Sequence, residues 1–432
     1  MNNTASSSSS LQLKHLLNAT IIVAALGYFV DIYDLILFSI VRIPSLKTIG
    51  ISEFDSAKYG GWLLNIQMFG MLIGGLFWGI LGDKKGRLSV LFGSILMYSL
   101  ANILNGMVST LPQYMVLRFV AGFGLAGELG AGITLVVEQM KKEHRGYGTM
   151  IVATIGVSGA IFGGLFGYYF GRIGEGWRIC YYIGGTMGLA LLVMRIGIFE
   201  SGMFHKMKEQ THIQRGNFFM LFTSMKNLKK YVKCILIGWP CWYVIGILVF
   251  YSKEIAAALH VQGVIVPPLA VAASYAGTTF GDLLCGLISQ WLKSRTKTIL
   301  IYLIATVVAL IFYFSLSNLS TTAFYWLIFI VGVGVGYWAV FITIAAESFG
   351  TNIRSTVTTT VPNFVRGSLI IISAMYTLSQ TMLSNFFENL SHEKIIIDAA
   401  IITGIIVMAL SFYAVLRMED TFHKDLNYVE EQ

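Results

Sequence analysis

Long apolar stretches recur along the whole chain and constrain its fold more than any other feature. A helix needs about 20 residues to cross the roughly 30 Å hydrocarbon core of a bilayer, and twelve stretches meet this length. The composition agrees, because 56% of the residues are hydrophobic and only 12% are charged, whereas soluble domains carry about 25% charged residues. The sequence therefore predicts an all-α membrane protein with twelve transmembrane helices. The predicted spans are 17–46, 57–82, 88–109, 112–140, 147–172, 178–200, 231–259, 264–292, 298–317, 321–348, 354–384 and 394–417.

Basic residues gather in the loops on one side of these spans. They include Lys14, the loops 83–87, 141–145 and 293–297, and the segment 201–233, whereas the opposite loops hold fewer. Because loops rich in Lys and Arg stay in the cytoplasm, we expect both termini to be cytoplasmic and the chain to lie in the inner or plasma membrane of the cell. This bias accounts for the net charge of +8, so the charge does not indicate nucleic-acid binding.

The polar segment 201–233 is the only long interruption of the apolar pattern, and it divides the spans into two groups of six. We therefore expect two six-helix bundles joined by a cytoplasmic linker. The predicted organisation is a disordered cytoplasmic tail at 1–16, an N-terminal bundle at 17–200, a linker at 201–230, a C-terminal bundle at 231–417 and a cytoplasmic tail at 418–432.

The two groups of spans share an internal repeat. At an offset of 209 residues, Glu138 falls on Glu347, Arg145 on Arg354 and Gly127 on Gly336. In both copies a series of glycines precedes a Glu, and an Arg follows that Glu seven residues later. Repeated halves of this kind are typical of secondary transporters.

The stretch "GILGDKKGRLSVLFG" resembles the loop between spans two and three of the major facilitator superfamily, written G-x-x-x-D-x-x-G-R-[RK]. Asp83, Gly86 and Arg87 match this motif, and Leu88 departs from it. Within the superfamily, the Asp-x-Tyr-Asp-Leu of the first span and "RFVAGFGLAGELGAGITLVVEQ" resemble proton-coupled symporters of phosphate, sialic acid, aromatic acids and other organic anions. The resemblance implies two pseudo-symmetric six-helix bundles around a central cavity.

A conformational latch is predicted on the cytoplasmic side. A carboxylate and an arginine at helix ends can pair or can cap a neighbouring helix, and such contacts hold one conformation closed. The alternative is that the loop is a positively charged turn that only fixes the topology. The predicted latch residues are Asp83, Gly86, Arg87, Glu138, Arg145, Glu347 and Arg354.

Three carboxylates interrupt apolar spans. Asp31 and Asp34 are three residues apart in the first span, and Glu128 lies near the middle of the fourth. Because a charge in the bilayer costs about 2.5–3.5 kcal/mol on the insertion scale, such groups usually face an aqueous cavity and mark function. The family resemblance would place all three around the central cavity. We expect them to carry the coupled protons, with structural hydrogen bonds to neighbouring helices as the alternative for Asp31 and Asp34.

Two arginines also lie inside predicted spans. Arg366 is about 12 residues into the eleventh span, where it could bind a substrate carboxylate or phosphate with its planar guanidinium. It could instead pair with Asp282 or with a carboxylate of the first half. Arg118 lies near the outer end of the fourth span and could reach the interface, so we expect a structural role for it.

Further side chains are candidates for the substrate site. Spans seven and ten carry aromatic residues at positions where their first-half counterparts carry carboxylates. These rings could pack a substrate against a polar wall, although aromatic residues in helices also serve as plain packing. The candidates are Trp242, Tyr243, Tyr337 and Trp338, together with the polar Asn65, Gln67 and Asn363.

Other classes of protein lack support in the sequence. The four cysteines have no CxxC or Cys/His spacing, which argues against a disulfide framework or a metal site. The sequence contains no P-loop and no set of nucleophile, base and oxyanion donors. We therefore expect no enzyme activity and no cofactor. A sensor with a transporter fold would need a large additional soluble segment.

The sequence as a whole predicts a secondary transporter that works by alternating access. We expect it to import a small polar, anionic metabolite with one or more protons and to function as a monomer in the lipid bilayer. Proton-coupled export of a drug or metabolite is the alternative. Phosphate itself fits poorly, because phosphate symporters usually have Asp-Tyr where this chain has Glu128-Leu129.

Overall fold

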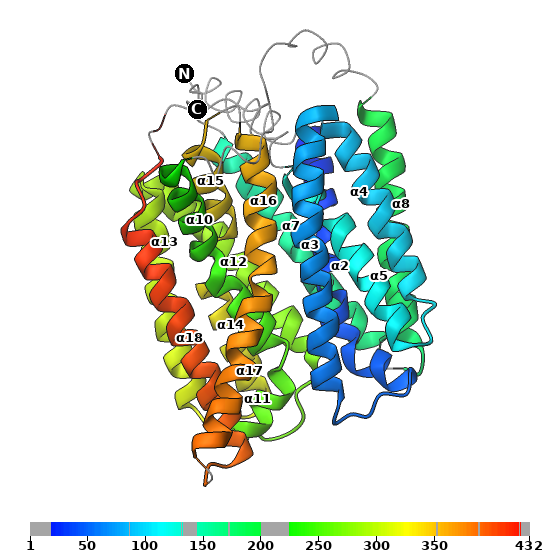
Figure 1. Ribbon diagram of the computed structural model, residues 1–432, viewed down its shortest axis with the longest axis vertical. Helices are drawn as coiled ribbons and strands as arrows, with labels where there is room; N and C mark the ends of the chain where they lie inside the picture. Colours follow the sequence, from blue (N-terminus) through cyan, green and yellow to red (C-terminus); the bar gives the residue numbers. More distant parts are fainter. Residues whose placement is uncertain are drawn as a thin grey trace, which may run out of the picture.

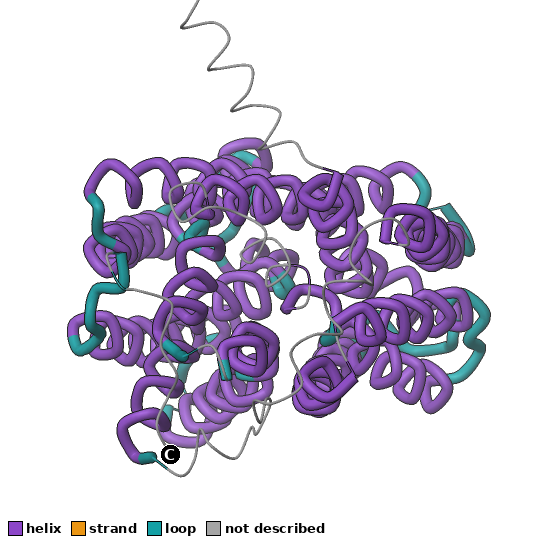
Figure 2. The backbone as a smooth tube through the Cα atoms, turned by 90° about the horizontal axis from the view of Figure 1, so that it is seen from above, coloured by secondary structure: helices purple, strands orange, loops and turns teal. Residues whose placement is uncertain are grey.

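The computed structural model describes residues 19–85, 87–130, 132, 145–171, 173–199, 224–350, 353–387, 389–422 and 424. These residues are almost entirely helical. The described β-structure consists of one isolated bridge between Gln262 and Ser320. Figure 2, which looks along the bundle, shows the helices packed side by side and joined by short loops. The predicted all-α fold is confirmed.

The first half of the chain forms long helices that match the first six predicted spans. Most of their side chains are apolar, so each helix can lie in lipid while its backbone hydrogen bonds are satisfied internally. The helices are α2 (Ala19–Thr48), α3 (Ser56–Lys85), α4 (Arg87–Asn105), α5 (Leu111–Leu125), α7 (Arg145–Tyr169) and α8 (Gly176–Phe199).

The second half contains more helices because three of its spans are broken. The helices are α10 (Met225–Tyr243), the π-helix η1 (Val244–Val249), α11 (Ser252–Ala258), α12 (Pro267–Leu292), α13 (Arg295–Ser315), α14 (Thr321–Gly334), α15 (Trp338–Ser348), α16 (Arg354–Gly367), α17 (Leu369–Phe386) and α18 (His392–Leu416).

The breaks occur where the sequence weakens the helix. Pro240 near the end of α10 has no N–H to donate and crowds the preceding turn, and the chain widens into η1 directly after it. Pro362 and Gly367 similarly precede the change from α16 to α17. Helix breaks at membrane depth occur where the backbone lines a cavity or is buried in protein. The helix breaks therefore indicate that the middle of the second half is a candidate for a solute-binding cavity.

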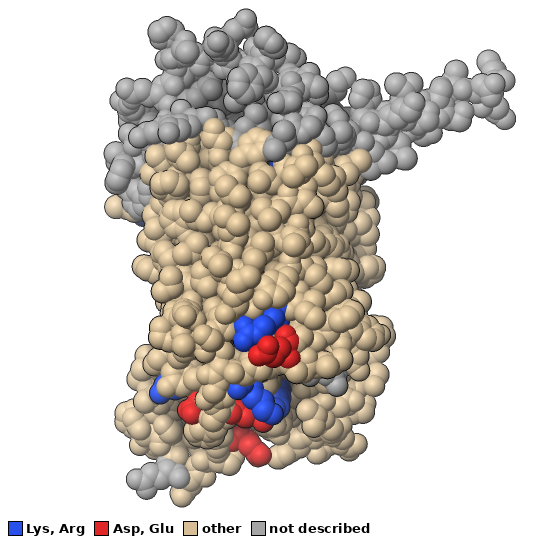
Figure 3. All heavy atoms as spheres, turned by 90° about the vertical axis from the view of Figure 1, so that its right-hand side faces the viewer, with Lys and Arg blue, Asp and Glu red and all other residues tan. Residues whose placement is uncertain are grey.

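Ten helical segments among the described residues are long and apolar enough to cross a membrane. The other two predicted spans correspond to α4, a shorter apolar helix, and to α5, whose predicted continuation to residue 140 lies largely outside the described residues. Figure 3 views the side formed by α4, α5 and α8, where the described surface is uncharged over most of its height. Exposed apolar residues such as Val116 and Val193 contribute to such surfaces, as expected for a protein surrounded by lipid.

The helices form two groups that lie side by side (Figure 1). Helices α2 to α8 form one group and α10 to α18 the other, and the groups meet where α7 packs against α12 and α3 against α16. Helix α2 begins, and α18 ends, at the same end of the molecule. We call this end the terminal face and the opposite end the distal face.

A segment that follows α18 closes the terminal face of the second half. Asp420 accepts hydrogen bonds from the Thr296 N–H at 3.1 Å and the Thr296 hydroxyl at 2.7 Å, and it also accepts one from Ser294. These donors form the N-terminus of α13, where a negative charge is favourable. Partial burial raises the pKa of Asp420, but the hydrogen bonds from Ser294, the Phe422 N–H and Thr296 outweigh burial and bring the pKa down to about 2.

We expect Asp420→Asn to lower the thermal unfolding midpoint by about 2 °C at neutral pH, because it removes a charged cap worth about 1 kcal/mol. The folded pKa lies below the unfolded value, so the wild-type contribution is complete above about pH 4. It is lost as the pH falls towards about 2. The unfolding midpoints of the wild type and of Asp420→Asn should therefore converge as the pH falls. A constant difference between them down to pH 2 would contradict this role of Asp420.

Candidate functional site

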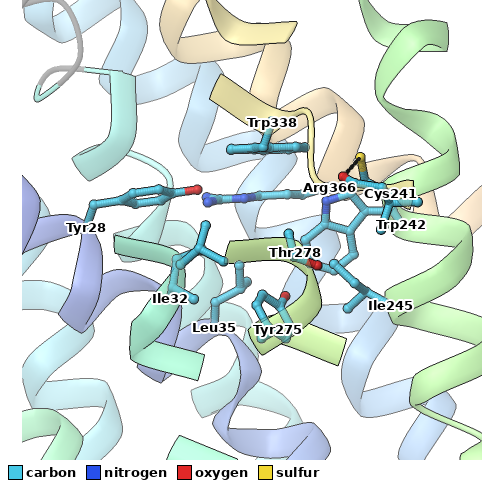
Figure 4. A pocket seen from close by; sticks show the side chains of 12 residues that line it. Tyr28, Ile32, Leu35, Cys241, Trp242, Ile245, Tyr275, Thr278, Trp338 and Arg366 are labelled. Carbon is cyan, nitrogen blue, oxygen red and sulfur yellow. Dashed lines mark hydrogen bonds between the residues drawn. The ribbon is translucent and has the colours of Figure 1, made fainter. Parts of the chain in front are cut away.

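A cavity lies between the two halves at the level of the broken helices (Figure 4). The space left between its walls is about 30 Å³, which is room for about two water molecules. The helices must therefore move apart before a larger solute can enter. The described side chains that line it come from both halves and are mostly aromatic or aliphatic: Tyr28, Ile32, Leu35, Val157, Cys241, Trp242, Ile245, Tyr275, Thr278, Val335, Trp338 and Arg366.

Arg366 contributes a positive charge to this apolar lining. It lies at the end of α16, and its guanidinium extends beneath the ring of Trp338 towards Tyr28 (Figure 4). Its Nη2 donates to Asp31 Oδ2 across a long contact of 3.5 Å, while Nε and Nη1 have no hydrogen-bond partner among the described residues. Both side chains are buried, with exposed fractions of 1% and 0%. Arg366 is thus held by one long contact and keeps free donors.

The structure distinguishes between the partners considered for Arg366. Asp282 accepts the Ala339 N–H at 3.0 Å and so caps the start of α15. The partner of Arg366 is instead Asp31, a carboxylate of the first half. The contact joins α2 to α16 across the cavity, between residues that are 335 positions apart in the chain.

Glu128 is paired with an arginine that the sequence analysis did not single out. Arg195 of α8 donates to both carboxylate oxygens of Glu128, at 3.0 Å from Nη1 to Oε2 and through a second bond from Nη2 to Oε1. Both side chains are 2% exposed. A side chain at Gly27 would collide with this ion pair. Gly27 precedes Asp31 by four residues, so the ion pair lies about one helical turn from Asp31. An arginine within the apolar sixth span was the signal that could have revealed it.

We expect Glu128→Gln to destabilise the protein by about 3–5 kcal/mol, because it leaves Arg195 buried without a counter-charge. The double variant Glu128→Gln with Arg195→Met should regain most of this loss. Thermal unfolding in detergent measures both effects. An unchanged midpoint for Glu128→Gln together with loss of proton-driven transport would instead favour the proton-carrying role expected from the sequence.

Arg118 lies inside the first half rather than at its surface. It is fully buried, donates to the side-chain oxygen of Gln67, and stacks on Phe38 with 5.2 Å between the guanidinium carbon and the ring centre. Gln67 also donates to the Leu35 carbonyl at 3.3 Å. Gln67 therefore positions Arg118 and is not among the described cavity-lining residues.

The aromatic candidates divide into two groups. Trp242 and Trp338 line the cavity. The hydroxyl of Tyr243 donates to the Ala400 carbonyl at 2.7 Å, and that of Tyr337 donates to the Ile237 carbonyl at 2.9 Å. These two tyrosines join helices of the second half to each other. They are thus packing residues in this conformation.

Two amide candidates connect the halves above and below the cavity. On the terminal side, Asn363 donates to the Ala126 carbonyl at 2.8 Å and joins α16 to the end of α5. On the distal side, Asn65 accepts a hydrogen bond from the Ser373 hydroxyl at 3.3 Å and joins α3 to α17. Contacts of this kind therefore join the halves on both sides of the cavity in this conformation.

The predicted latch is only partly described. Gly86 and Glu138 lie outside the described residues, as do the side chains of Asp83, Arg87, Arg145 and Arg354. Glu347 is described, and it contacts Arg295 at the start of α13 at 3.4 Å and accepts the Thr421 hydroxyl at 2.7 Å. In the second half this carboxylate therefore holds a neighbouring helix end on the terminal face.

Two ion pairs between the halves on the distal face, Arg42 with Glu254 and Glu53 with Lys253, were not predicted, and we call them the distal gate. Arg42 near the end of α2 forms an ion pair of 2.7 Å with Glu254 of α11, and its guanidinium carbon lies 4.5 Å from the centre of the Phe250 ring. An exposed ion pair between Glu53 and Lys253 lies beside it. Both pairs join the first half to the second. Charged residues at the ends of spans are usually solvated, so their pairing gives no signal in the sequence.

We expect Arg42→Ala to open the distal face, because it removes a buried cation that bridges the halves and leaves Glu254 without its partner. Spin labels at Phe54→Cys and Val264→Cys report this, since both positions are exposed in distal loops of different halves. Their distance distribution should shift to longer values. Lys253→Ala is the matched control, because its exposed ion pair contributes only about 0–1 kcal/mol. Equal distributions in all three proteins would contradict the gate.

Comparisons with known proteins agree with this architecture. The model of the Major Facilitator Superfamily matches residues 24–374. The niacin transporter NiaP of Acinetobacter baylyi is 28% identical over 40% of this chain and 38% of its own, and the benzoate transport protein of the same organism is 29% identical over 44% and 41%. These matches thus span about two fifths of each relative. The solved proton:xylose symporter XylE has 14% identity and a TM-score of 0.70, covering 94% of this chain and 97% of its own.

Proposed function

Since the chain belongs to the Major Facilitator Superfamily of multi-pass membrane transporters, we propose that it imports a small aromatic carboxylate together with protons. Import would proceed by alternating access around the cavity between the two halves. The observation that carries this proposal is Arg366, a fully buried arginine in an aromatic cavity with two unpaired nitrogen donors.

The cavity has complementary chemistry for such a solute. The free donors of Arg366 can bind a carboxylate, which a guanidinium recognises with planar geometry. Trp242, Tyr275 and Trp338 provide flat apolar walls nearby, and an aromatic ring can pack against them. Two relatives are named as transporters of niacin and of benzoate, and both of these solutes are aromatic carboxylates.

Asp31 would couple the proton to the substrate. Asp31 already forms an ion pair with Arg366, so an ionised Asp31 competes with the substrate carboxylate for the same guanidinium. Protonation of Asp31 removes its negative charge and releases Arg366. A proton and a carboxylate therefore replace one ion pair with another, and the charge around Arg366 stays balanced.

Charge balance also explains why neither solute would cross alone. The halves would close over a cavity of about 30 Å³ with a mostly apolar lining, where an unpaired charge is costly. Substrate without the proton would leave one negative charge too many, and the proton without substrate would leave Arg366 unpaired. Only the empty carrier with ionised Asp31 and the carrier loaded with both solutes can close at low cost.

We also propose how the rest of the chain serves this cycle. Residues 17–200 and 231–417 would move as two bodies, with the distal gate and the predicted latch closing opposite faces. The terminal face would be cytoplasmic, as the basic loops predict. One chain contains the whole cavity, so we propose that a monomer transports.

We expect Arg366→Lys to weaken the affinity for benzoate or nicotinate by about tenfold or more, because lysine keeps the charge but loses the planar fork. Asp31→Asn should abolish accumulation driven by a proton gradient while leaving substrate exchange intact. Proteoliposomes with an imposed pH gradient measure uptake, and counterflow measures exchange. Thermal unfolding verifies that both variants are folded.

Arg178→Lys is the matched control, because Arg178 donates to the Gly106 and Val108 carbonyls at the distal end of the first half. Its affinity should equal that of the wild type. Equal transport of benzamide and benzoate would contradict recognition of a carboxylate. Movement of substrate only against an opposing proton flux would replace import with the export alternative.

A further inference from the structure

A second group of buried polar side chains lies in the first half, apart from the cavity. We call it the Asp34 chamber and define it by Asp34, Tyr98, Ser99 and Asn102. All four residues are 0% exposed. The hydroxyls of Tyr98 and Ser99 have no hydrogen-bond partner among the described residues, and Asp34 and the Asn102 amide have none other than each other.

The chamber lies between α2, α4 and α8. A side chain at Gly184 would collide with Asp34, and one at Gly188 would collide with Ser99 and contact the ring of Tyr98. Gly184 and Gly188 are one turn apart, so the α8 backbone packs directly against Asp34 and Ser99 at these two positions. Figure 1 shows these three helices within the first half. Asp31 instead contacts Arg366 at the cavity, so the two aspartates lie in different environments.

A row of polar side chains continues from the chamber along α4. Tyr98, Asn102 and Asn105 are spaced four and three residues apart and therefore share one face of the helix. Asn105 is the last residue of α4, at the end towards the distal face, and its amide is also buried without a partner. The row thus joins Asp34 to the distal end of the first half.

These groups require a small polar ligand. Each buried polar group without a partner loses its hydration without compensation, and an ionised carboxylate loses more. A metal ion fits poorly, because no cluster of three or more His, Cys, Asp or Glu exists among the described residues. The positive charge of Arg118 also acts on Asp34. Water has the matching hydrogen-bonding chemistry, since a buried water typically makes about three hydrogen bonds to such groups.

We propose that the Asp34 chamber holds ordered water, which conducts protons from the distal face past Asn105 and Asn102 to Asp34, and from there to Asp31. This inference rests on the proposed proton symport. Asp34 accepts one proton from a chamber water, which regains a proton from the distal solvent, and Asp34 passes one proton to Asp31. The route therefore ends with the water restored, Asp34 ionised again and Asp31 neutral. Asp31 would then receive its proton from Asp34, on the side away from the substrate cavity.

The electrostatic surroundings support this direction. Tyr98 packs against Gly124 of α5, which precedes Glu128 by four residues, so the polar row begins near the charged groups beside Asp31. The paired Glu128 and Arg195 close the terminal end of this polar region. The distal end carries the unpaired amide of Asn105. Protons therefore have a polar path to the distal side and meet an ion pair on the terminal side.

Radiolytic hydroxyl-radical labelling tests the water without any substrate. Radicals formed at bound water oxidise adjacent side chains, and mass spectrometry resolves single residues. Tyr98 should be labelled about tenfold faster than Tyr243 if it contacts water. The two are matched, because both are 0% exposed but the Tyr243 hydroxyl already donates to Ala400. Equal protection of the two tyrosines would overturn the chamber.

Asn102→Leu tests the route, because it keeps the side-chain shape but removes both polar atoms. Labelling of Tyr98 should fall to the level of Tyr243. The rate of proton-driven uptake in proteoliposomes should fall by about tenfold, while counterflow exchange stays within twofold of the wild type. Thr403→Val is the control, since Thr403 is equally buried and already bonded to the Ala399 carbonyl. Asn105→Leu provides a second variant if Asn102→Leu does not fold.

The outcomes separate this inference from the proposed function. If the Asn102→Leu variant loses the labelling of Tyr98 but keeps wild-type uptake, the proton route is overturned. Labelled Tyr98 in a protein that transports aromatic carboxylates without protons would overturn the symport, and with it the route, but would support the water. Loss of labelling and uptake together, with exchange preserved, would support the whole proposal.

Discussion

The contact between Arg366 and Asp31 is the interaction on which the arrangement of the cavity depends. A buried guanidinium needs a counter-charge, and here the counter-charge comes from the opposite half of the molecule. The pair therefore ties the two halves together at the level of the broken helices. The long distance of 3.5 Å and the unpaired nitrogens make it a contact that a stronger carboxylate ligand could replace.

The other buried arginines show how different compensation gives different roles. Arg195 has a bidentate carboxylate partner within its own half, so its counter-charge does not come from the other half. Arg118 is held by an amide and by aromatic rings. Arg42 has a short ion pair across the distal face. Only a weakly held cation inside a cavity can exchange partners, and among these four arginines that description fits Arg366.

The fold could be read from hydropathy, because the number of long apolar stretches fixes the number of spans. The buried charges Asp31, Asp34, Glu128 and Arg366 were also visible as interruptions of those stretches. Their pairing was not settled, because it depends on how helices distant in sequence rotate against each other. For Arg366 the sequence left Asp282 and a first-half carboxylate open, and for Glu128 it offered no partner. The hydroxyls of Tyr243 and Tyr337 illustrate the same limit, since both point to backbone carbonyls that no sequence pattern identifies.

The pseudo-symmetry of the two halves makes their chemical difference informative. The first half carries the carboxylates and the unpaired polar chamber, whereas the second contributes Arg366, Trp242 and Trp338 to the cavity. Protons would therefore be handled by the first half and the carboxylate by the second. The two solutes would meet only at the contact between Asp31 and Arg366. Coupling then needs no long-range signal, because the same motion that closes the halves brings these two charges together.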